Sequence, residues 1–230
     1  MLIGPQNLAV HVNHVRSRIS HAAKAAGRDP GSVTLVAVTK AKPAESVRSA
    51  ATAGVTDFGE NYLKEALGKM DELAPLALHW HFIGALQSNK TRAVAQHFDW
   101  VHSVDRLSVA RRLSEQRPFH APPLNVCIQV ALVPEPAKGG VEPANLAELA
   151  LRTAELPHLR LRGLMCVPPP QPSPLAERAV FGRLRILLEG LNREGLNLDT
   201  LSMGMSADFE SAIAEGATLV RIGTAIFGGR

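Results

Sequence analysis

Residues 33–43, VTLVAVTKAKP, decide how the fold is interpreted. The first seven are mostly apolar and several are β-branched, which is typical of a strand buried on both faces. The run leads straight to Lys40, and Pro43 prevents the strand from continuing. If Val36 and Val38 point into a core, alternation along the strand places Lys40 on the same side.

Similar apolar runs recur along the whole chain, and amphipathic segments of helical periodicity separate them. The strand-like runs are residues 33–39, 55–60, 80–86, 100–104, 124–130, 161–167, 200–205 and 219–226. Eight continuous runs joined by helices favour a closed (β/α)8 barrel of parallel strands. An open doubly wound sheet is the competing α/β fold, but no glycine-rich dinucleotide fingerprint follows the first strand.

Apolar residues at helical spacing also predict a helix over residues 5–26. Little or no helix is expected after the eighth strand, so we expect this first helix to fill the gap in the outer ring. No linker or change of composition divides the chain. We therefore expect residues 1–230 to form a single domain.

The composition excludes several classes of protein. The formal net charge is +4, but the basic residues are scattered and aromatic residues make up only 4%, so a nucleic-acid partner is not expected. No segment has the pattern of a signal peptide or of a membrane span. Cys127 and Cys166 lie inside apolar runs without metal-binding spacing. These features predict a monomeric cytoplasmic protein with free, buried thiols.

Lys40 has two interpretations. It can be an ordinary surface lysine at the end of a strand. If it points into the barrel instead, it needs a partner or a lowered pKa, because burying an unpaired ammonium group is costly. Lysines of the second kind are the usual Schiff-base nucleophiles.

The seventh and eighth strands carry features that suit an anion. Ser206 has the position of a helix N-cap, and Gly204 removes bulk beside it. Arg221 interrupts the apolar run of the eighth strand and must be paired or hydrogen-bonded there, in a structural salt bridge or in a site. Gly223 and Thr224 follow it, in the region where (β/α)8 barrels often bind phosphate. A lysine opposite such a site suits a phosphorylated aldehyde.

Three other stretches carry weaker signals. His79 and His81 form an H-x-H pair, but they open the third strand rather than end it, so a metal site is not expected. Lys138 lies in residues 136–141, PAKGGV, a loop after the fifth strand whose role the sequence leaves open. The proline-rich residues 167–174 are interpreted as a stiff connector.

Seven ordered motifs resemble a known family. They are AVTKAKP, FGENYLKEA, WHFIGALQSNK, HFDWVHSVD, LRLRGLMCV, TLSMGMSADFESAI and VRIGTAIFG. Together they are similar to the pyridoxal phosphate homeostasis proteins, whose barrel resembles the N-terminal domain of alanine racemase. The resemblance implies a single (β/α)8 barrel that holds pyridoxal 5′-phosphate (PLP) as an internal aldimine and serves PLP-dependent apoenzymes as partners.

The resemblance also implies which residues bind the cofactor. Lys40 carries the covalent bond, and Asn61 lies beside the ring. Ser202 and Ser206 are candidates for the phosphate side, where Gly223 and Thr224 supply further contacts. Arg221 faces the pyridine nitrogen, as in the related racemases, or else the phosphate. The residues implied for the cofactor are thus Lys40, Asn61, Ser202, Ser206, Arg221, Gly223 and Thr224.

Some details of the chain depart from the family pattern. Residues 137–140 read AKGG where Ser-Lys-Ser-Gly is common, and Ala131 and Ala207 stand where Asn and Asp are usual. Transfer of detail to these loops is therefore weaker than transfer to Lys40 or Arg221.

The expected function is to bind, protect and deliver PLP without significant racemase activity. A permanently charged arginine at the pyridine nitrogen would make PLP a weak electron sink. Racemization also needs a second base, and the chain has one tyrosine, Tyr62. Two alternatives remain: a catalytic PLP-dependent amino-acid racemase or lyase, and a Schiff-base aldolase without a cofactor.

Overall fold

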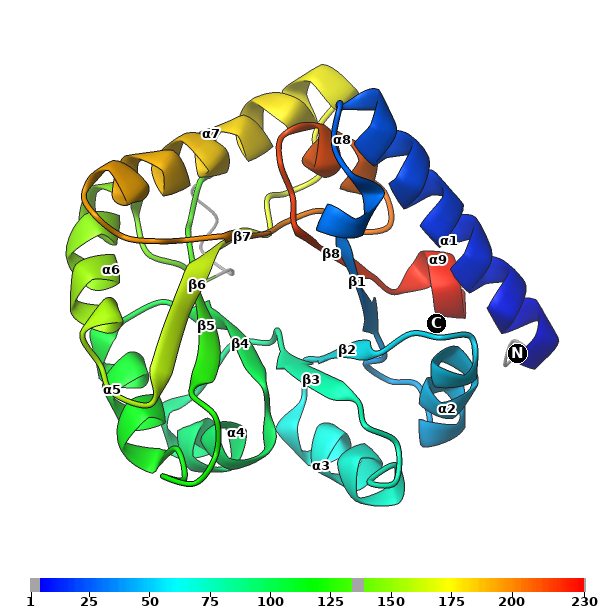
Figure 1. Cartoon of the computed structure of the whole chain (residues 1–230), viewed down its shortest axis with the longest axis horizontal. Coiled ribbons are helices and arrows are strands. Elements are labelled where there is room, and N and C mark those ends of the chain that lie inside the picture. The colour runs from blue at the N-terminus through cyan, green and yellow to red at the C-terminus, as the bar shows by residue number, and fades with distance from the viewer. Residues whose placement is uncertain (1–4, 134–138, 230) are drawn as a thin grey trace.

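Eight parallel strands close into a barrel in the computed structural model of the chain, which describes residues 5–133 and 139–229 (Figure 1). The strands lie in chain order around the barrel, and β8 pairs with β1 to complete it. They are β1 Thr34–Val38, β2 Asp57–Glu60, β3 His79–Phe82, β4 Trp100–Val104, β5 Leu124–Gln129, β6 Leu159–Met165, β7 Thr200–Ser202 and β8 Leu219–Ile222. The predicted (β/α)8 barrel is confirmed.

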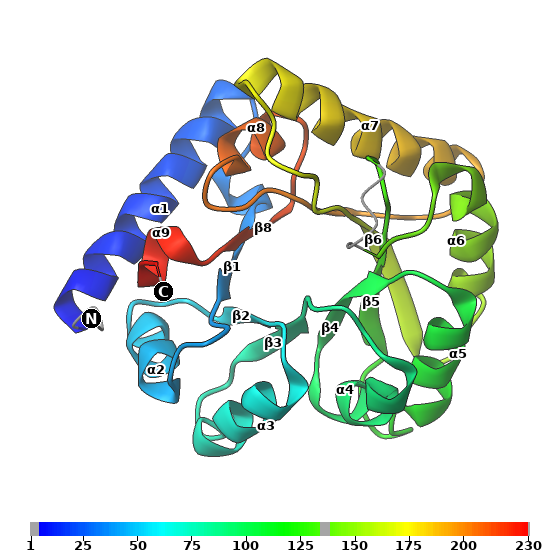
Figure 2. The same cartoon turned by 180° about the vertical axis from the view of Figure 1, so that it is seen from behind.

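Helices surround the barrel on the outside, as both faces of the molecule show (Figures 1 and 2). They are α1 Pro5–Ala25, α2 Ala44–Thr52, α3 Leu63–Glu72, α4 Thr91–His97, α5 Leu107–Gln116, α6 Leu146–Ala154, α7 Pro174–Arg193, α8 Phe209–Ala214 and α9 Thr224–Phe227. Short 3-10 turns occur at η1 Pro30–Ser32, η2 Ser88–Lys90 and η3 Pro143–Asn145. None of the helices among the described residues has the length and apolar character that crossing a membrane requires.

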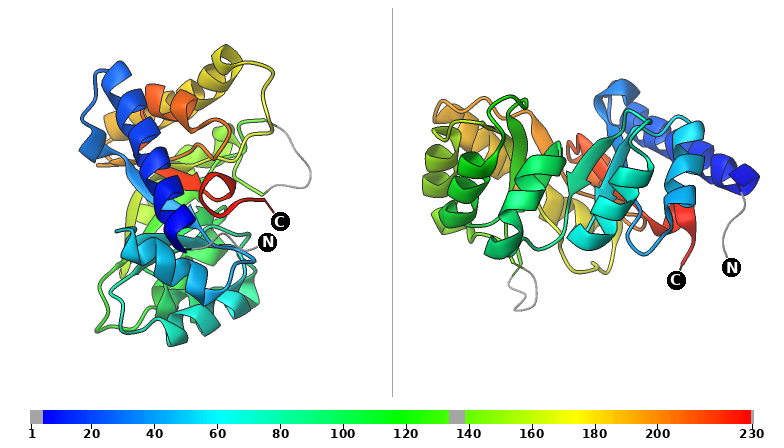
Figure 3. Two further views of the ribbon diagram at one scale, coloured as in Figure 1. Left: turned by 90° about the vertical axis from the view of Figure 1, so that its right-hand side faces the viewer. Right: turned by 90° about the horizontal axis from the view of Figure 1, so that it is seen from below.

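Helix α1 occupies the place in the outer ring that would follow β8. It packs against α2, α8 and α9 (Figure 3). It buries Leu8, Val12, Val15 and Ile19, which recur at helical spacing. The prediction that the first helix fills the gap is confirmed.

The end of β8 differs from the sequence-based prediction. The strand was expected to continue to residue 226, but it stops at Ile222 and a single helical turn, α9, follows. The carbonyl oxygen of Gly223 accepts hydrogen bonds from the amides of Ile226 and Phe227, at 3.0 and 2.9 Å. The apolar residues after Gly223 therefore coil and pack against α1 instead of extending the strand.

The interior of the barrel is partly polar. Val36 and Val38 point inward, since a Cβ atom placed on Gly59 of the neighbouring strand would meet their methyl groups at 3.2 and 3.5 Å. Barrel interiors are usually filled by branched apolar side chains. This one also buries four polar side chains, His81, His102, Ser202 and Arg221.

Candidate functional site

A pocket of about 360 Å³ opens at the C-terminal ends of the strands. This volume falls within the range of about 300–1,000 Å³ that is typical of small-molecule sites. The lining residues are Val38, Lys40, Asn61, Ile83, Val167, Met205, Ser206, Ala207, Arg221, Gly223 and Thr224. The structure therefore brings together all of the predicted site residues except Ser202, which does not line the pocket.

Lys40 reaches this pocket from a turn instead of from the strand itself. The strand ends at Val38, and Lys40 is exposed two residues later, without a hydrogen bond or ion pair to any described residue. Lys42 differs, because its Nζ donates to the carbonyl oxygens of Phe227 and Gly229, at 3.0 and 3.2 Å. Of the two lysines in AVTKAKP, only Lys40 thus has an ammonium group available in the pocket.

A buried ion pair lies directly behind the Lys40 turn. Lys69 of α3 donates to Glu60 Oε1 at 2.6 Å, to Glu65 Oε1 at 2.6 Å and to the carbonyl oxygen of Thr39 at 2.7 Å. The Thr39 hydroxyl also donates to Glu60 Oε1, at 2.6 Å. Burial raises the pKa of the Glu60 carboxyl, although the hydrogen bonds from Lys69 and Thr39 act in the opposite direction. We call Thr39, Glu60, Glu65 and Lys69 the turn clamp.

The turn clamp also holds a strained residue. Ala41 has a φ of 58°, a left-handed conformation that residues other than glycine adopt at some cost. Its amide donates to Glu65 Oε1 at 2.7 Å. Since Glu65 and the Thr39 carbonyl share the same ammonium group, the backbone on both sides of Lys40 is fixed by Lys69.

Asn61 follows β2 and lines the pocket, where its Oδ1 is buried without a hydrogen-bond partner among the described residues. Gly84 packs directly against the Asn61 backbone. A Cβ atom at Gly84 would lie 2.9 Å from both the carbonyl carbon and the Cα atom of Asn61. Glycine is therefore required at this position for Asn61 to lie as close to β3 as it does.

Arg221 forms the floor of the pocket and is 4% exposed. Its Nη1 donates to Ser202 Oγ at 2.7 Å, and its Nη2 donates to the carbonyl oxygen of Cys166 at 2.8 Å. Burial lowers the pKa of the guanidinium, but arginine remains charged in proteins. A structural salt bridge was one sequence-based interpretation of Arg221, and neither of these two acceptors is a carboxylate.

Ser202 lies below Arg221 and inside the barrel. Its hydroxyl oxygen contacts Arg221 Nη1 and His102 Nδ1, both at 2.7 Å. The hydroxyl is thus engaged on both sides and turned away from the lining of the pocket.

The turn after β7 was predicted to place Ser206 at a helix N-cap, and this prediction is wrong. Helix α8 begins at Phe209 with Asp208 at the N-cap, and the Asp208 carboxylate accepts from the Met205 amide at 2.6 Å. Ser206 Oγ instead accepts from the amide of Ala225 in α9, at 3.3 Å. Its hydroxyl therefore joins the turn after β7 to the turn after β8, on the side of the pocket where Gly223 and Thr224 lie.

The histidines of the H-x-H pair and the two cysteines do not line this pocket. His79 is exposed, His81 is buried inside the barrel, and no group of three or more His, Cys, Asp or Glu side chains in residues 5–133 and 139–229 could hold a metal ion. Cys127 and Cys166 are buried free thiols, and burial raises the pKa of each to about 12. Lys138 lies outside the described residues.

Comparison with known proteins assigns the family. Residues 10–230 match the family model described as "Alanine racemase, N-terminal domain". A protein of Pseudomonas aeruginosa, named pyridoxal phosphate homeostasis protein, is 60% identical over 97% of this chain and 96% of its own length. The chain belongs to the pyridoxal phosphate homeostasis protein family.

Other members of the pyridoxal phosphate homeostasis protein family extend the comparison. The homologue of that name from Escherichia coli K12 is 50% identical over 97% of both chains. PipY of Synechococcus elongatus PCC7942, solved with PLP bound, is 38% identical. It superposes with a TM-score of 0.85 over 96% of this chain and 100% of its own.

Proposed function

We propose that this chain binds PLP in the pocket at the C-terminal ends of the strands and takes part in PLP homeostasis. The observation that carries the proposal is the pairing of an exposed lysine, Lys40, with a buried arginine, Arg221, in one pocket of suitable volume. The solved PLP complex of a relative that matches nearly the whole chain supports it.

The residues of the pocket fit the cofactor's functional groups. Lys40 is placed to bond covalently with the aldehyde. The unpartnered Oδ1 of Asn61 is a buried acceptor that needs a donor, and Asn61 also has amide donors to offer. Two of the five N–H groups of Arg221 have described acceptors, which leaves others for a ligand. Ser206, Gly223 and Thr224 lie in the turns where such barrels bind phosphate.

Two features favour a carrier over an enzyme. When bound, PLP supplies an electron sink whose strength depends on the group beside its pyridine nitrogen. A guanidinium there opposes protonation of that nitrogen and so weakens the sink. Racemization also requires a second base. Among the described residues that line the pocket, Lys40 is the one side chain that can act as a base once it has lost its proton. Tyr62 lines a neighbouring hollow instead. A PLP-dependent racemase or lyase is the alternative.

The test is the visible absorption spectrum of purified protein, with added PLP and with borohydride, for wild type, Lys40→Ala and Lys42→Ala. We expect a reducible band in wild type and in Lys42→Ala that is absent from Lys40→Ala, with the reduced adduct on the peptide that contains Lys40. A wild-type protein that stays colourless after PLP is added contradicts the proposal, and an aldolase that acts on sugar phosphates becomes the function to test.

Carrier and enzyme are separated by two further assays on loaded protein. A carrier transfers PLP to a PLP-dependent apoenzyme, and activity of that apoenzyme reports the transfer. A racemase or lyase turns over amino acids at a rate that Lys40→Ala abolishes. We expect transfer without significant turnover.

A further inference from the structure

A row of hydrogen-bonded polar side chains crosses the barrel from the pocket to its opposite rim. It starts at Arg221 Nη1, which lies 2.7 Å from Ser202 Oγ, and Ser202 Oγ lies 2.7 Å from His102 Nδ1. His102 Nε2 lies 2.9 Å from His81 Nδ1, and His81 Nε2 lies 3.0 Å from Asp57 Oδ1. We call Arg221, Ser202, His102, His81 and Asp57 the polar row.

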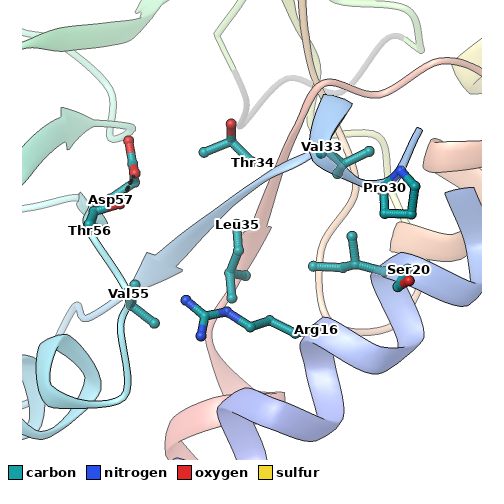
Figure 4. Close-up of a pocket in the computed structure, with 11 residues that line it drawn as sticks. Arg16, Ser20, Pro30, Val33, Thr34, Leu35, Val55, Thr56 and Asp57 are labelled. Atoms are coloured by element: carbon teal, nitrogen blue, oxygen red, sulfur yellow. Dashed lines mark hydrogen bonds between the residues drawn. The ribbon is translucent and has the colours of Figure 1, made fainter. Parts of the chain in front are cut away.

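The far end of the polar row reaches the N-terminal rim of the barrel. Asp57 is the first residue of β2 and forms one wall of a second pocket of about 360 Å³. Figure 4 shows Asp57 and Thr56 on one side of this pocket and Arg16 and Ser20 of α1 on the other. The row therefore connects two surfaces that lie at opposite ends of the strands.

Donor and acceptor chemistry gives the hydrogen bonds a single direction when both histidines are neutral and Asp57 is ionised. Arginine can only donate, so Ser202 Oγ accepts from Arg221 and has its own hydrogen left for His102 Nδ1. A neutral His102 that accepts at Nδ1 carries its proton on Nε2 and donates it to His81 Nδ1. By the same argument, His81 is protonated on Nε2 and donates to Asp57. All four bonds thus run from the cation to the carboxylate.

The environment keeps both histidines neutral and Asp57 ionised. Burial lowers the pKa of His81, and it lowers the pKa of His102 well below its usual range, where His81 and Arg221 also contribute. Burial would raise the pKa of Asp57, but hydrogen bonds from His81 and Thr56 leave it below its ordinary value. Aligned hydrogen bonds in a low dielectric polarise one another, so the Asp57 charge strengthens the bond that Arg221 makes to Ser202.

Two satisfied core histidines would be a simpler explanation of His81 and His102. Two satisfied core histidines would not need hydrogen bonds that all run in one direction. They would also not need a cation at one end of the row and a carboxylate at the other. That explanation also gives no reason for the row to end on Arg221, the one buried cation among the described residues that line the pocket. We propose that Ser202, His102, His81 and Asp57 position the Arg221 guanidinium for the cofactor, so that breaking a hydrogen bond of the row near the far rim alters how the pocket binds PLP.

This inference rests on the proposed function but assigns Ser202 a different part in it. Ser202 acts through Arg221 and not on the phosphate. Two matched pairs of variants test it. Ser202→Ala removes the acceptor of Arg221 Nη1 and leaves the Cys166 carbonyl that Nη2 contacts, whereas Ser202→Thr keeps a hydroxyl. His81→Gln breaks the row. His79→Gln changes a histidine that lies 3.5 Å from Asp57 Oδ1 but takes part in none of the row's four hydrogen bonds.

The first readout needs no cofactor. Ring ¹⁵N chemical shifts of the apo protein at pH 7 should show His81 and His102 neutral and protonated on Nε2. This pattern should persist in Ser202→Thr and His79→Gln. Protonation of His102 on Nδ1 would overturn the inference, because Ser202 could not then donate to it.

The second readout is PLP binding, followed by spectrophotometric titration. We expect Ser202→Ala and His81→Gln to weaken binding about tenfold, which equals ~1.4 kcal/mol, and to shift the absorption maximum of bound PLP. Ser202→Thr and His79→Gln should match wild type. Folded Ser202→Ala and His81→Gln proteins with wild-type affinity and spectrum would refute the positioning role while PLP binding itself stands. If wild type binds no PLP, the proposed function fails instead, and the apo ring shifts still decide the direction of the row.

Discussion

Replacing Lys69 with methionine tests whether the turn clamp stabilises the barrel. Methionine has a similar length and no charge, so Lys69→Met removes three hydrogen bonds with little change in volume. It leaves the Glu60 carboxylate, whose side chain is 0% exposed, without a cation. The Thr39 hydroxyl becomes its one remaining partner among the described residues.

The size of the effect follows from the burial of both partners. Breaking a buried ion pair by removing one partner costs about 3–5 kcal/mol, because an uncompensated charge remains in the interior. Glu60 can relieve this cost by binding a proton, since its Oε2 has no described partner and burial already raises the pKa of its carboxyl. Each unit by which that pKa rises is worth about 1.4 kcal/mol.

The sign of the pH dependence is then fixed. Above a pH of about 4.3 the unfolded chain has lost this proton, while folded Lys69→Met retains it up to its raised pKa. The folded state binds more protons in this window, so its stability decreases as the pH rises. We expect a loss of about 3 kcal/mol relative to wild type at pH 8 and a smaller loss at pH 5.5.

The assay is urea unfolding of wild type, Lys69→Met and the double variant Glu60→Gln/Lys69→Met at both pH values. The double variant should recover part of the loss at pH 8, because it removes the buried charge. Lys64→Met changes an exposed lysine on the same helix and should leave stability nearly unchanged. A Lys69→Met protein that loses less than about 1 kcal/mol at both pH values would refute the reasoning, since a pair this deeply buried should cost more.

Three further outcomes are expected. Gly84→Ala forces the Asn61 backbone away from β3 and should cost about 1–3 kcal/mol in urea unfolding as well as weaken PLP binding; unchanged values of both would show that the backbone adapts freely. Burial lowers the pKa of His81 and His102, so below a pH of about 6.5 the unfolded chain binds protons that the folded chain does not, and thermal stability should fall as the pH decreases from 7 to 5; a flat profile would contradict this. Cys166, whose pKa is raised to about 12, should not react with a thiol reagent at pH 8 until urea unfolds the protein, and rapid labelling of the native chain would contradict its burial.

The barrel could be predicted from the sequence because its signal is repeated. Eight apolar runs separated by helical segments leave few folds that bury every run. An error in where one strand begins or ends does not change the number of strands. The ends themselves were less predictable. The strand that contains Arg221 stops at Ile222 and a helical turn begins at Thr224, although the apolar pattern continues through both.

The residues of the site were predictable where they break a pattern. Lys40 and Arg221 each place a charge in an apolar run, and this is visible without a structure. Lys69 could not be found in this way, because a lysine on an amphipathic helix normally faces solvent, and its burial depends on Glu60 and Thr39 from other segments. The prediction for Ser206 was wrong because a serine before a helical pattern usually caps it, whereas here its hydroxyl accepts from the Ala225 amide and α8 begins at Phe209, directly after Asp208.

His81 and His102 did give a signal that could have been used. Both lie inside apolar strands. The residues next to them in the sequence point to the other face of the sheet, where they are buried under the helices. The H-x-H spacing does not predict a metal site, because it occurs at the rim opposite to the one where barrels carry out catalysis. The interpretation that the two histidines connect one rim of the barrel to the other depends on the order in which the strands pair. The spacing of the histidines in the sequence does not reveal that order.

A hydrogen-bond chain with one direction has a consequence for how this protein can change over evolutionary time. No interior member can be replaced by an apolar residue without stranding a donor on one side and an acceptor on the other. Single substitutions in the polar row therefore destabilise the protein, whereas replacing several of its members at once costs far less stability. The histidines of β3 and β4 and the serine of β7 should then be inherited as a block, retained together or exchanged together, even though 121 positions separate the first from the last.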